Sequence, residues 1–207
     1  PGRDPRPEFK TAQFSADGTE AFAPYSRTVH NAVFAFEEMP LAWGRLSLGA
    51  RVESVQIDSS GNPLVARFVP ASRSFTPQSY AAGLLWHAAP GWQLTTNLAY
   101  TERPPTFYEL YANGLHVATG AYEEGNPDMS IEKGSNLDMA IAWKDGANRF
   151  KIGAFGSDFS NYIVLLGTGQ QVDTDEGPVP VYQFSGMPAR LYGMELEGNW
   201  RLLDKGR

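Results

Sequence analysis

The sequence predicts an all-β protein, an antiparallel up-and-down transmembrane β-barrel that is present here as a partial barrel of about seven or eight strands. Three observations support this prediction. Apolar and polar residues alternate along several segments, the connections alternate between short and long, and aromatic residues stand at the ends of the apolar rows. Short periplasmic turns, long extracellular loops and aromatic girdles are typical of outer-membrane barrels.

Seven strands are predicted in chain order, and alternation is the main reason for them. In the second one, Leu46, Leu48 and Ala50 lie on one face while Ser47 and Gly49 lie on the other. All of the predicted strands reach 11 or more residues, which suits a tilted span that needs about 9 to 11. The predicted strands are residues 28–38, 45–57, 78–88, 92–102, 133–144, 148–160 and 189–203.

The predicted connections alternate strictly in length. The first of each pair is a short periplasmic turn, and the second is a long extracellular loop rich in Pro, Gly, Asn and Asp. We also expect residues 1–27 to form an extracellular loop, within which residues 8–16 would make an eighth strand. The short turns are residues 39–44, 89–91 and 145–147, and the long loops are residues 58–77, 103–132 and 161–188.

The positions of aromatic residues distinguish a membrane barrel from a soluble sandwich better than periodicity does, because apolar and polar residues alternate along the strands of both folds. Trp92, Trp143 and Trp200 stand next to the predicted short turns, whereas Tyr100 and Tyr192 mark the opposite ends of apolar faces. Two aromatic girdles one strand length apart are expected of a membrane-spanning barrel. A soluble β-sandwich binding module with these aromatics in its core remains an alternative, as does a complete eight-stranded barrel with a structural or adhesive role.

Composition narrows the range of functions. The chain has 17 basic and 23 acidic residues, a net charge of −6, and no dense run of Lys or Arg, so nucleic acid is not an expected partner. The absence of cysteine excludes disulfides and thiolate chemistry. No phosphate-binding, nucleophile-elbow or zinc-protease motif is present, and we therefore do not expect an enzyme.

The ends of the sequence predict a piece of a longer protein. The chain opens at Pro1 without a signal segment, inside a loop-like region, and its last residues resemble a short turn. A partial barrel has open strand edges, so we expect an isolated piece to aggregate or to associate with itself.

Several segments carry a family resemblance. The stretch Tyr100-Thr101-Glu102-Arg103-Pro104-Pro105-Thr106-Phe107-Tyr108-Glu109-Leu110-Tyr111 resembles the strand-to-loop passage of TonB-dependent receptor barrels. The prolines would end a strand and direct the loop that follows. Further similarity to the family lies in residues 113–120, 122–123, 125–129, 132–136, 158–163 and 193–197.

The resemblance implies a receptor in the outer membrane of a Gram-negative bacterium. Such a receptor captures a scarce nutrient, a metal ion or a metal chelate such as a siderophore, and imports it with energy derived from TonB. The implied partners are outer-membrane lipid, TonB, the ligand and a plug domain, which is absent from residues 1–207. The loop that contains His116 is similar to the branch of the family associated with zinc or other metal uptake, so the transported ligand would be zinc or an iron chelate. No cofactor is expected in the fragment itself.

The candidate metal ligands are His116, Glu123 and Asp128, which share the long loop region 103–132. Imidazole and carboxylate both bind borderline metals such as zinc. The other two histidines, His30 and His87, fall in strands and are interpreted as wall residues. No zinc-ligand spacing links the three histidines.

Two acidic groups are interpreted without a catalytic role. Glu195 and Glu197 are two apart on a strand, so they share its polar face and are predicted to line a solvated wall with Arg201 and Arg51. The acidic segment 172–176 lacks the Gly and Glu positions of a calcium loop and is interpreted as a solvated loop tip.

Overall fold

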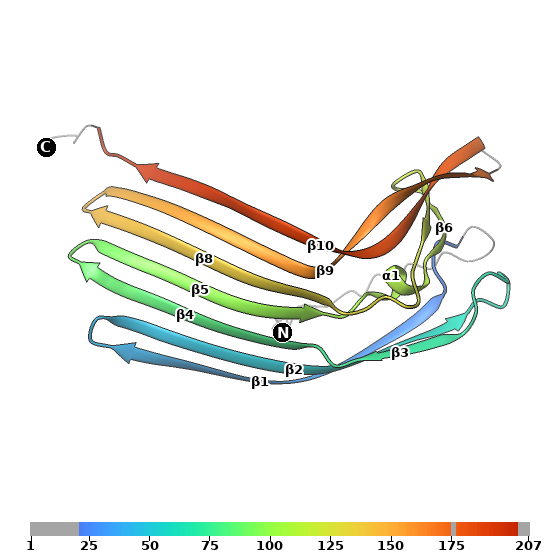
Figure 1. Cartoon of the computed structure of the whole chain (residues 1–207), viewed down its shortest axis with the longest axis horizontal. Coiled ribbons are helices and arrows are strands. Elements are labelled where there is room, and N and C mark those ends of the chain that lie inside the picture. The colour runs from blue at the N-terminus through green and yellow to red at the C-terminus, as the bar shows by residue number, and fades with distance from the viewer. Residues whose placement is uncertain (1–20, 175–176, 203–207) are drawn as a thin grey trace, which may run out of the picture.

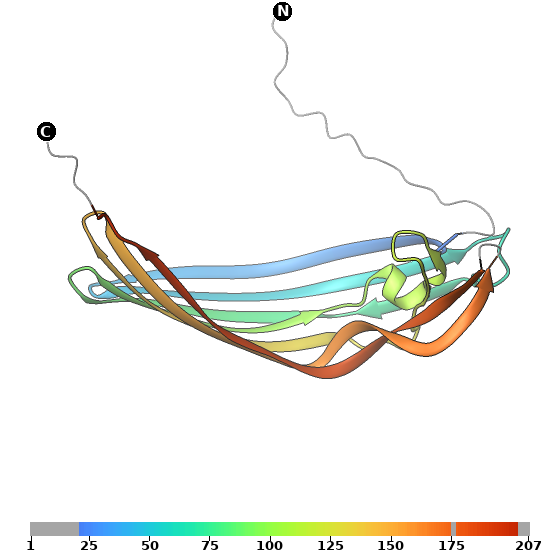
Figure 2. The ribbon, with the colours of Figure 1, turned by 90° about the horizontal axis from the view of Figure 1, so that it is seen from above.

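The computed structural model describes residues 21–174 and 177–202 as a curved sheet with one short helix on its concave side (Figures 1 and 2). No helix in the described segments is both long and apolar enough to cross a membrane. The elements are β1 (Tyr25–Leu41), β2 (Gly44–Gly61), β3 (Ala71–Phe75), β4 (Gln78–Ala89), β5 (Trp92–Arg103), α1 (Phe107–Tyr111), β6 (Asn113–His116), β7 (Ala121–Glu124), β8 (Glu132–Asp145), β9 (Asn148–Thr174) and β10 (Gly177–Asn199).

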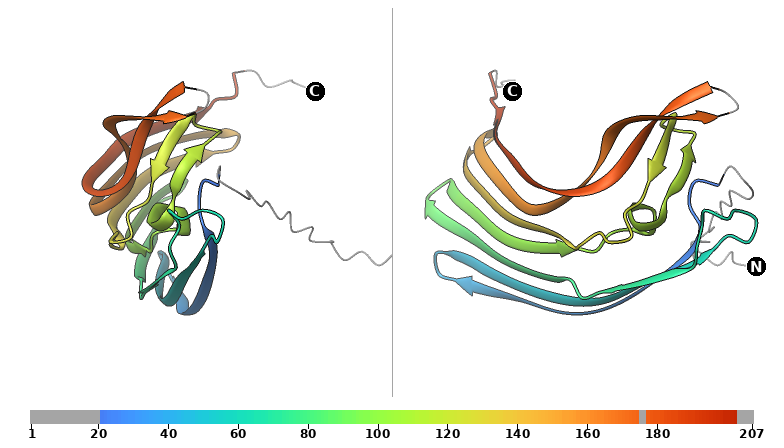
Figure 3. Two further views of the ribbon diagram at one scale, coloured as in Figure 1. Left: turned by 90° about the vertical axis from the view of Figure 1, so that its right-hand side faces the viewer. Right: turned by 45° about the vertical axis from the view of Figure 1, so that its right-hand side comes forward.

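The described strands form one sheet in the order β1-β2-β4-β5-β8-β9-β10-β7-β6, and β3 pairs with β2. All pairings are antiparallel except that of β7 with β10. The sheet curves like a trough and is not closed (Figure 3). This architecture confirms a partial up-and-down barrel. It contains no second sheet against the apolar face within the described residues, as a sandwich would require.

All seven predicted strands are present, and the three predicted short turns connect them at one end of the sheet, the short-turn end. The opposite end, which carries α1, β3, β6 and β7, is called the loop end. The tight turns have a local cause at Gly91 and Gly146, whose positive φ angles of 79° and 55° suit glycine.

One of the predicted long loops is wrong. The long loop expected at 161–188 is instead the continuation of β9 and β10, which pair up to Thr174 and Gly177. Prolines in this region suggested a loop, but Pro188 lies at a register shift between the strands and Pro180 borders a second one, positions where a missing N–H is tolerated. The two other predicted loops contain β3, α1, β6 and β7.

The N-terminal expectation is only partly covered by the structure. The further strand at 8–16 lies outside the described residues. β1 begins at Tyr25, so the last residues of the loop expected over 1–27 belong to a strand.

Over β2, β4, β5, β8, β9 and β10 the register separates a mainly apolar face from a mainly polar face, whereas β1 carries Phe34 and Phe36 on the polar side. Residues opposite one another in antiparallel strands point to the same side of the sheet. The polar face is concave, because α1 packs there against the odd-numbered residues Val55 and Ile57 of β2. One convex row runs through Leu48, Ala82, Leu98, Leu137, Gly156 and Tyr192. The concave row beside it runs through Ser47, Gly83, Asn97, Asp138, Phe155 and Gly193.

Tryptophans border the convex face at the short-turn end. The rings of Trp92 and Trp143 are 6.4 Å apart, and those of Trp143 and Trp200 are 6.2 Å apart. At the other border, Tyr80 stacks on Tyr100 with a centroid distance of 6.5 Å. From Trp92 to Tyr100, β5 rises about 26 Å. The nine residues from Trp92 to Tyr100 fall within the about 9 to 11 that a tilted strand needs to span a membrane.

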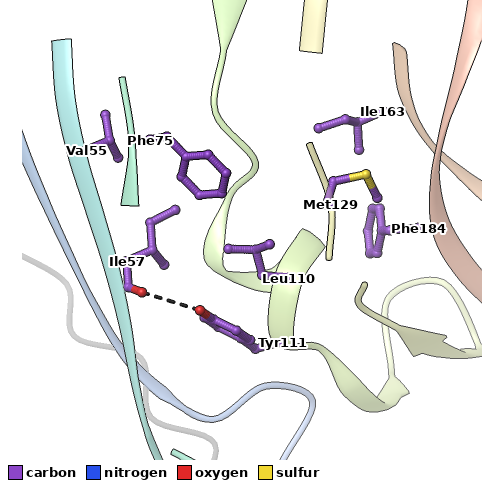
Figure 4. Packing of buried hydrophobic residues seen from close by; sticks show 8 residues of the cluster. All are labelled: Val55, Ile57, Phe75, Leu110, Tyr111, Met129, Ile163 and Phe184. Atoms are coloured by element: carbon purple, nitrogen blue, oxygen red, sulfur yellow. Dashed lines mark hydrogen bonds between the residues drawn. The ribbon is translucent and has the colours of Figure 1, made fainter. Parts of the chain in front are cut away.

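A hydrophobic core fills the concave side at the loop end (Figure 4). Leu110 of α1 is fully buried between β2 on one side and the β9–β10 pair on the other. The Tyr111 hydroxyl donates to the carbonyl of Ile57 at 3.4 Å and so ties α1 to the wall. The cluster consists of Val55, Ile57, Phe75, Leu110, Tyr111, Met129, Ile163 and Phe184.

The separation of faces predicts opposite outcomes for neighbouring substitutions. Leu98, 54% exposed in the middle of the convex face, should meet hydrocarbon, and Leu98→Arg should destabilise the full-length protein in lipid by about 2–4 kcal/mol. The control Asn97→Arg, on the concave face, should change stability by less than about 0.5 kcal/mol. Urea unfolding in lipid vesicles measures both, and equal losses would contradict the outward orientation of Leu98.

Candidate functional site

The candidate site is the group of segments that folds over the concave side at the loop end. After β5, the chain forms α1 and the β6–β7 hairpin, and β7 then pairs in parallel with β10 through Val181 and Tyr122. The hairpin therefore extends the sheet on the side of β10 away from β9. This pairing places the hairpin over the concave side at the loop end, as the right-hand view of Figure 3 shows. We call this region, which α1, β6 and β7 form, the mouth of the trough.

Arg103 fixes the point at which this loop leaves the wall. Its guanidinium donates to both carboxylate oxygens of Glu109, at 2.9 and 3.2 Å, and to both of Glu132, at 3.1 and 3.0 Å. The carboxylate of Glu109 also accepts the Thr106 N–H at 2.7 Å and completes a capping box with the Thr106 hydroxyl at the start of α1. One arginine thus joins the end of β5, the helix and the start of β8.

The charges in this network stabilise each other. Burial disfavours ionised Glu132, but the hydrogen bonds from Arg103 and from the Ile163 N–H outweigh it and hold the pKa of Glu132 below its usual value. Burial lowers the pKa of Arg103, and the contacts with Glu132 and Glu109 more than reverse this, so its pKa is raised. The side chains of Glu109 and Glu132 are only 8% and 12% exposed, so their charges depend on Arg103.

Arg67, from the connection between β2 and β3, joins three segments. Its Nη2 donates to the Ala21 carbonyl at 2.7 Å, its Nε donates to the Asn113 carbonyl, and its guanidinium stacks 4.8 Å above the Phe68 ring. The Asn113 N–H in turn donates to the Phe22 carbonyl at 3.0 Å. These contacts hold the start of β6 against the segment that precedes β1. Sequence reasoning missed Arg67, because its partners lie 46 residues away in each direction.

His116 stands at the end of β6 in a defined orientation. Its Nδ1 lies 2.9 Å from an oxygen of Glu123, and its ring stacks on Phe22 with a centroid distance of 4.5 Å. The Thr119 hydroxyl donates to the same Glu123 oxygen at 2.8 Å. The Glu123 side chain is 4% exposed, whereas that of His116 is 39% exposed. The second ring nitrogen, Nε2, makes no hydrogen bond within the described part of the chain.

The structure thus brings together two of the three predicted metal ligands. Asp128 is exposed, and its backbone N–H binds the Asn126 side chain in a turn after β7. Over residues 21–174 and 177–202, no group of three or more His, Asp or Glu side chains is arranged to hold a metal ion. The site therefore offers one imidazole supported by a buried carboxylate rather than a full metal cage.

Aromatic rings lie beside the hydrophobic core in the same mouth. Tyr108 contacts Phe184 at a centroid distance of 5.8 Å, and Phe107 meets the edge of Tyr108 at 5.5 Å. Phe107 and Tyr108 are partly exposed, whereas Phe184 is buried. The exposed rings add an apolar, planar surface to the mouth. The sequence pattern did not predict the contact between Tyr108 and Phe184, because Phe184 falls in the region 161–188 that was expected to be a loop.

The other acidic residues occupy the places expected of wall residues. Glu195 and Glu197 are exposed and pair in register with Gly153 and Lys151. Arg51 forms its ion pair with Glu53 at 2.8 Å on the same strand. Of the acidic segment 172–176, the last two residues lie outside the described residues, and the first three belong to β9.

Sequence comparison gives a family match over nearly the whole chain. The model of the family described as TonB dependent receptor-like, beta-barrel matches residues 3–206. The chain is also similar to Hemoglobin-haptoglobin utilization protein B of Neisseria meningitidis serogroup C, with 24% identity over 182 residues. This match covers 76% of the chain and 22% of the relative, so the chain spans about a fifth of that protein.

Solved structures share the fold. The copper transporter OprC superimposes with a TM-score of 0.68 at 18% identity, over 86% of this chain and 27% of that one. A double mutant of the Serratia marcescens hemophore receptor HasR, in complex with its hemophore HasA and heme, gives the same TM-score at 15% identity, over 89% of this chain and 33% of that one. The chain thus corresponds to about a quarter to a third of these structures.

The Arg103 network predicts a large effect of one substitution. Arg103→Gln should destabilise the loop end by about 3 kcal/mol, because it leaves two mostly buried carboxylates without a cation. The matched control is Arg190→Gln, which removes an exposed ion pair with Asp158 and should cost at most about 1 kcal/mol. Amide hydrogen exchange of α1 and β8 in the full-length protein measures the difference. Equal protection in the two variants would contradict the anchoring role of Arg103.

The lowered pKa of Glu132 predicts a pH dependence of the same segments. A carboxylate whose pKa is depressed by folding stabilises the folded state above its unfolded value, near 4.5, and this contribution is lost as the pH falls through the lower folded value. Protection of the Ile163 N–H, which donates to Glu132 at 2.8 Å, should therefore decline in acid below pH 4.5. In Glu132→Gln this decline should be absent. An identical acid profile in the variant would exclude Glu132 as the titrating group.

Proposed function

Because this chain belongs to the TonB-dependent receptor-like β-barrel family, we propose that it forms part of the wall and mouth of an outer-membrane receptor that captures a metal chelate and imports it with energy from TonB. The observation that carries the choice of cargo is the His116–Glu123 pair. The receptor is not an enzyme, and it lies in the outer membrane of a Gram-negative bacterium. Its partners are lipid, a plug domain, TonB and the ligand.

A histidine that binds a metal through one ring nitrogen typically donates its other ring N–H to a carboxylate. This contact fixes the tautomer and the direction of the ring. Glu123, buried and also bound by Thr119, holds Nδ1 of His116 in this way, so Nε2 is the nitrogen left to bind metal. We assign His116 the role of ligand and Glu123 the role of positioning residue. Asp128, which is exposed and removed from the pair, has no part in this arrangement.

A chelate fits this site better than a bare ion. A structural or tightly bound zinc ion requires about four ligands from the protein. The described mouth provides one imidazole and a carboxylate that is already engaged. A metal that arrives inside a chelate needs only the ligand that completes its coordination, as when a single histidine binds haem iron.

Aromatic residues at the loop end support a planar, partly apolar cargo. Phe22 stacks on the imidazole of His116, and Phe107 and Tyr108 of α1 expose aromatic rings at the same end of the sheet. The similar proteins have names that agree with such a cargo, since one is a hemoglobin-haptoglobin utilization protein and another is a hemophore receptor solved with heme. Haem is accordingly the first chelate to test. Zinc, which the resemblance to metal-uptake receptors suggests, is the second.

Haem titration of the full-length receptor tests the role of His116. We expect His116→Ala to abolish the absorption spectrum of imidazole-ligated iron and Glu123→Gln to weaken haem binding about 10- to 100-fold. His87→Ala is the matched control, because His87 lies in the wall near the short turns and should leave haem binding unchanged. Wild-type haem affinity in His116→Ala would remove His116 from the site. A parallel zinc titration that responds to His116→Ala while haem binding does not would favour the bare ion instead.

A further inference from the structure

The convex row of β1 contains one charged residue. The odd-numbered residues of β1 share the convex side with the residues of β2 opposite them. These pairs are Val33–Val52, Ala35–Ala50, Met39–Leu46 and Leu41–Gly44. Glu37 pairs with Leu48 in the middle of this row. The next residue, Glu38, points to the concave side and forms an ion pair with Arg45 at 3.3 Å.

Glu37 lies at the centre of the apolar band. On β1 and β2 the band begins at the turn that contains Trp43 and ends where the convex pairs become polar, at Asn31 and Ser54. Between these borders Glu37 is the one residue of the convex pairs of β1 and β2 that is not apolar. Two apolar pairs precede the Glu37–Leu48 pair along β1, and two follow it. Val33 is 79% exposed, so this part of the strand presents its side chains to the surroundings.

β2 offers no partner for the Glu37 carboxylate. The residue opposite is Leu48, and its diagonal neighbours on the same face are Leu46 and Ala50. Within the described residues, the Glu37 side chain has no ion pair or hydrogen bond, in contrast to Glu38. A charged side chain at the bilayer centre is costly and normally pairs with another group. The partner must therefore come from the other side of β1.

That side of β1 is a free strand edge. β1 pairs with β2 only, so one edge of a 17-residue strand has no hydrogen-bonded neighbour in the described part of the chain. Unpaired backbone groups are not tolerated in hydrocarbon, and barrels remove them by closure. A strand added here places its convex side chains about 4.5–5.5 Å from those of β1, within reach of a Lys or Arg side chain.

We propose that Glu37 forms an ion pair, within the membrane, with a basic side chain of the strand that pairs with the free edge of β1 in the whole protein. This inference rests on the proposed function in one respect, namely that the convex face meets lipid. The pair fixes the register of the adjoining strand, because a one-residue slip moves the basic side chain to the other face. Glu37 is a positioning residue for barrel closure and takes no part in ligand capture.

The sign of a stability change tests the pair. In the full-length protein, reconstituted as a monomer in phosphatidylcholine nanodiscs, Glu37→Leu should lower the thermal unfolding midpoint by at least about 2 °C, because it leaves the cation unpaired in hydrocarbon. If Glu37 faced lipid alone, the same substitution would raise the midpoint, and the proposal would be wrong. Glu38→Leu is the matched control, since it removes only an exposed concave pair and should change little.

A second measurement uses the unaltered protein. A fluorescent hydrophobic carbodiimide couples to carboxyl groups that are open to hydrocarbon, and Glu37 should resist it if a basic side chain covers it. Labelling that disappears in Glu37→Gln would overturn the pair. The midpoint can also be measured in vesicles at decreasing receptor-to-lipid ratio. If the destabilisation by Glu37→Leu vanishes on dilution, the cation belongs to a second copy of the protein, and the proposed pair within one barrel would be overturned. Leu98→Arg distinguishes failure of the ion pair from failure of the premise that the convex face meets lipid. If Leu98→Arg does not destabilise the protein, that premise is refuted.

Discussion

The alternation of side chains along continuously paired strands is the constraint on which the rest of the structure depends. Because β2, β4, β5, β8, β9 and β10 pair residue by residue over the wall, each convex side chain lies in a row of convex side chains. A one-residue slip in any pair would exchange the faces of that strand. The apolar band, its aromatic borders and the polar concave surface are therefore three consequences of one register.

The mouth is built on this wall by a few long-range polar contacts. Arg103 clamps the start and the end of the loop region 103–132 through Glu109 and Glu132, and Arg67 binds this loop to the segment before β1. Between these clamps, the hairpin joins β10 and carries His116. The wall thus supplies rigidity, and the clamps transmit it to the one imidazole that is aimed by a buried carboxylate.

Sequence reasoning reached the wall more completely than the mouth, for a physical reason. A period of two is a local signal, so the strands around Leu46, Leu94 and Leu137 were predicted with their faces and short turns. The extension of β9 and β10 was missed because Pro180 and Pro188 resemble loop residues until the register shifts are known. The contact of His116 with Glu123 depends on two strands of four residues each, too short for their alternation to be recognised.

The clamps also separate the strands that set the shape of the wall from the hairpin that carries His116. Arg103, at the end of β5, and Glu132, at the start of β8, hold the two ends of the loop together, and residues 112–124 lie between these ends. The tip of the hairpin, around Val117 and Gly120, makes no contribution to the wall pairing. In the receptor that we propose, substitutions confined to about a dozen residues of the hairpin region would change which chelate binds, while the strands of the wall would keep their spacing.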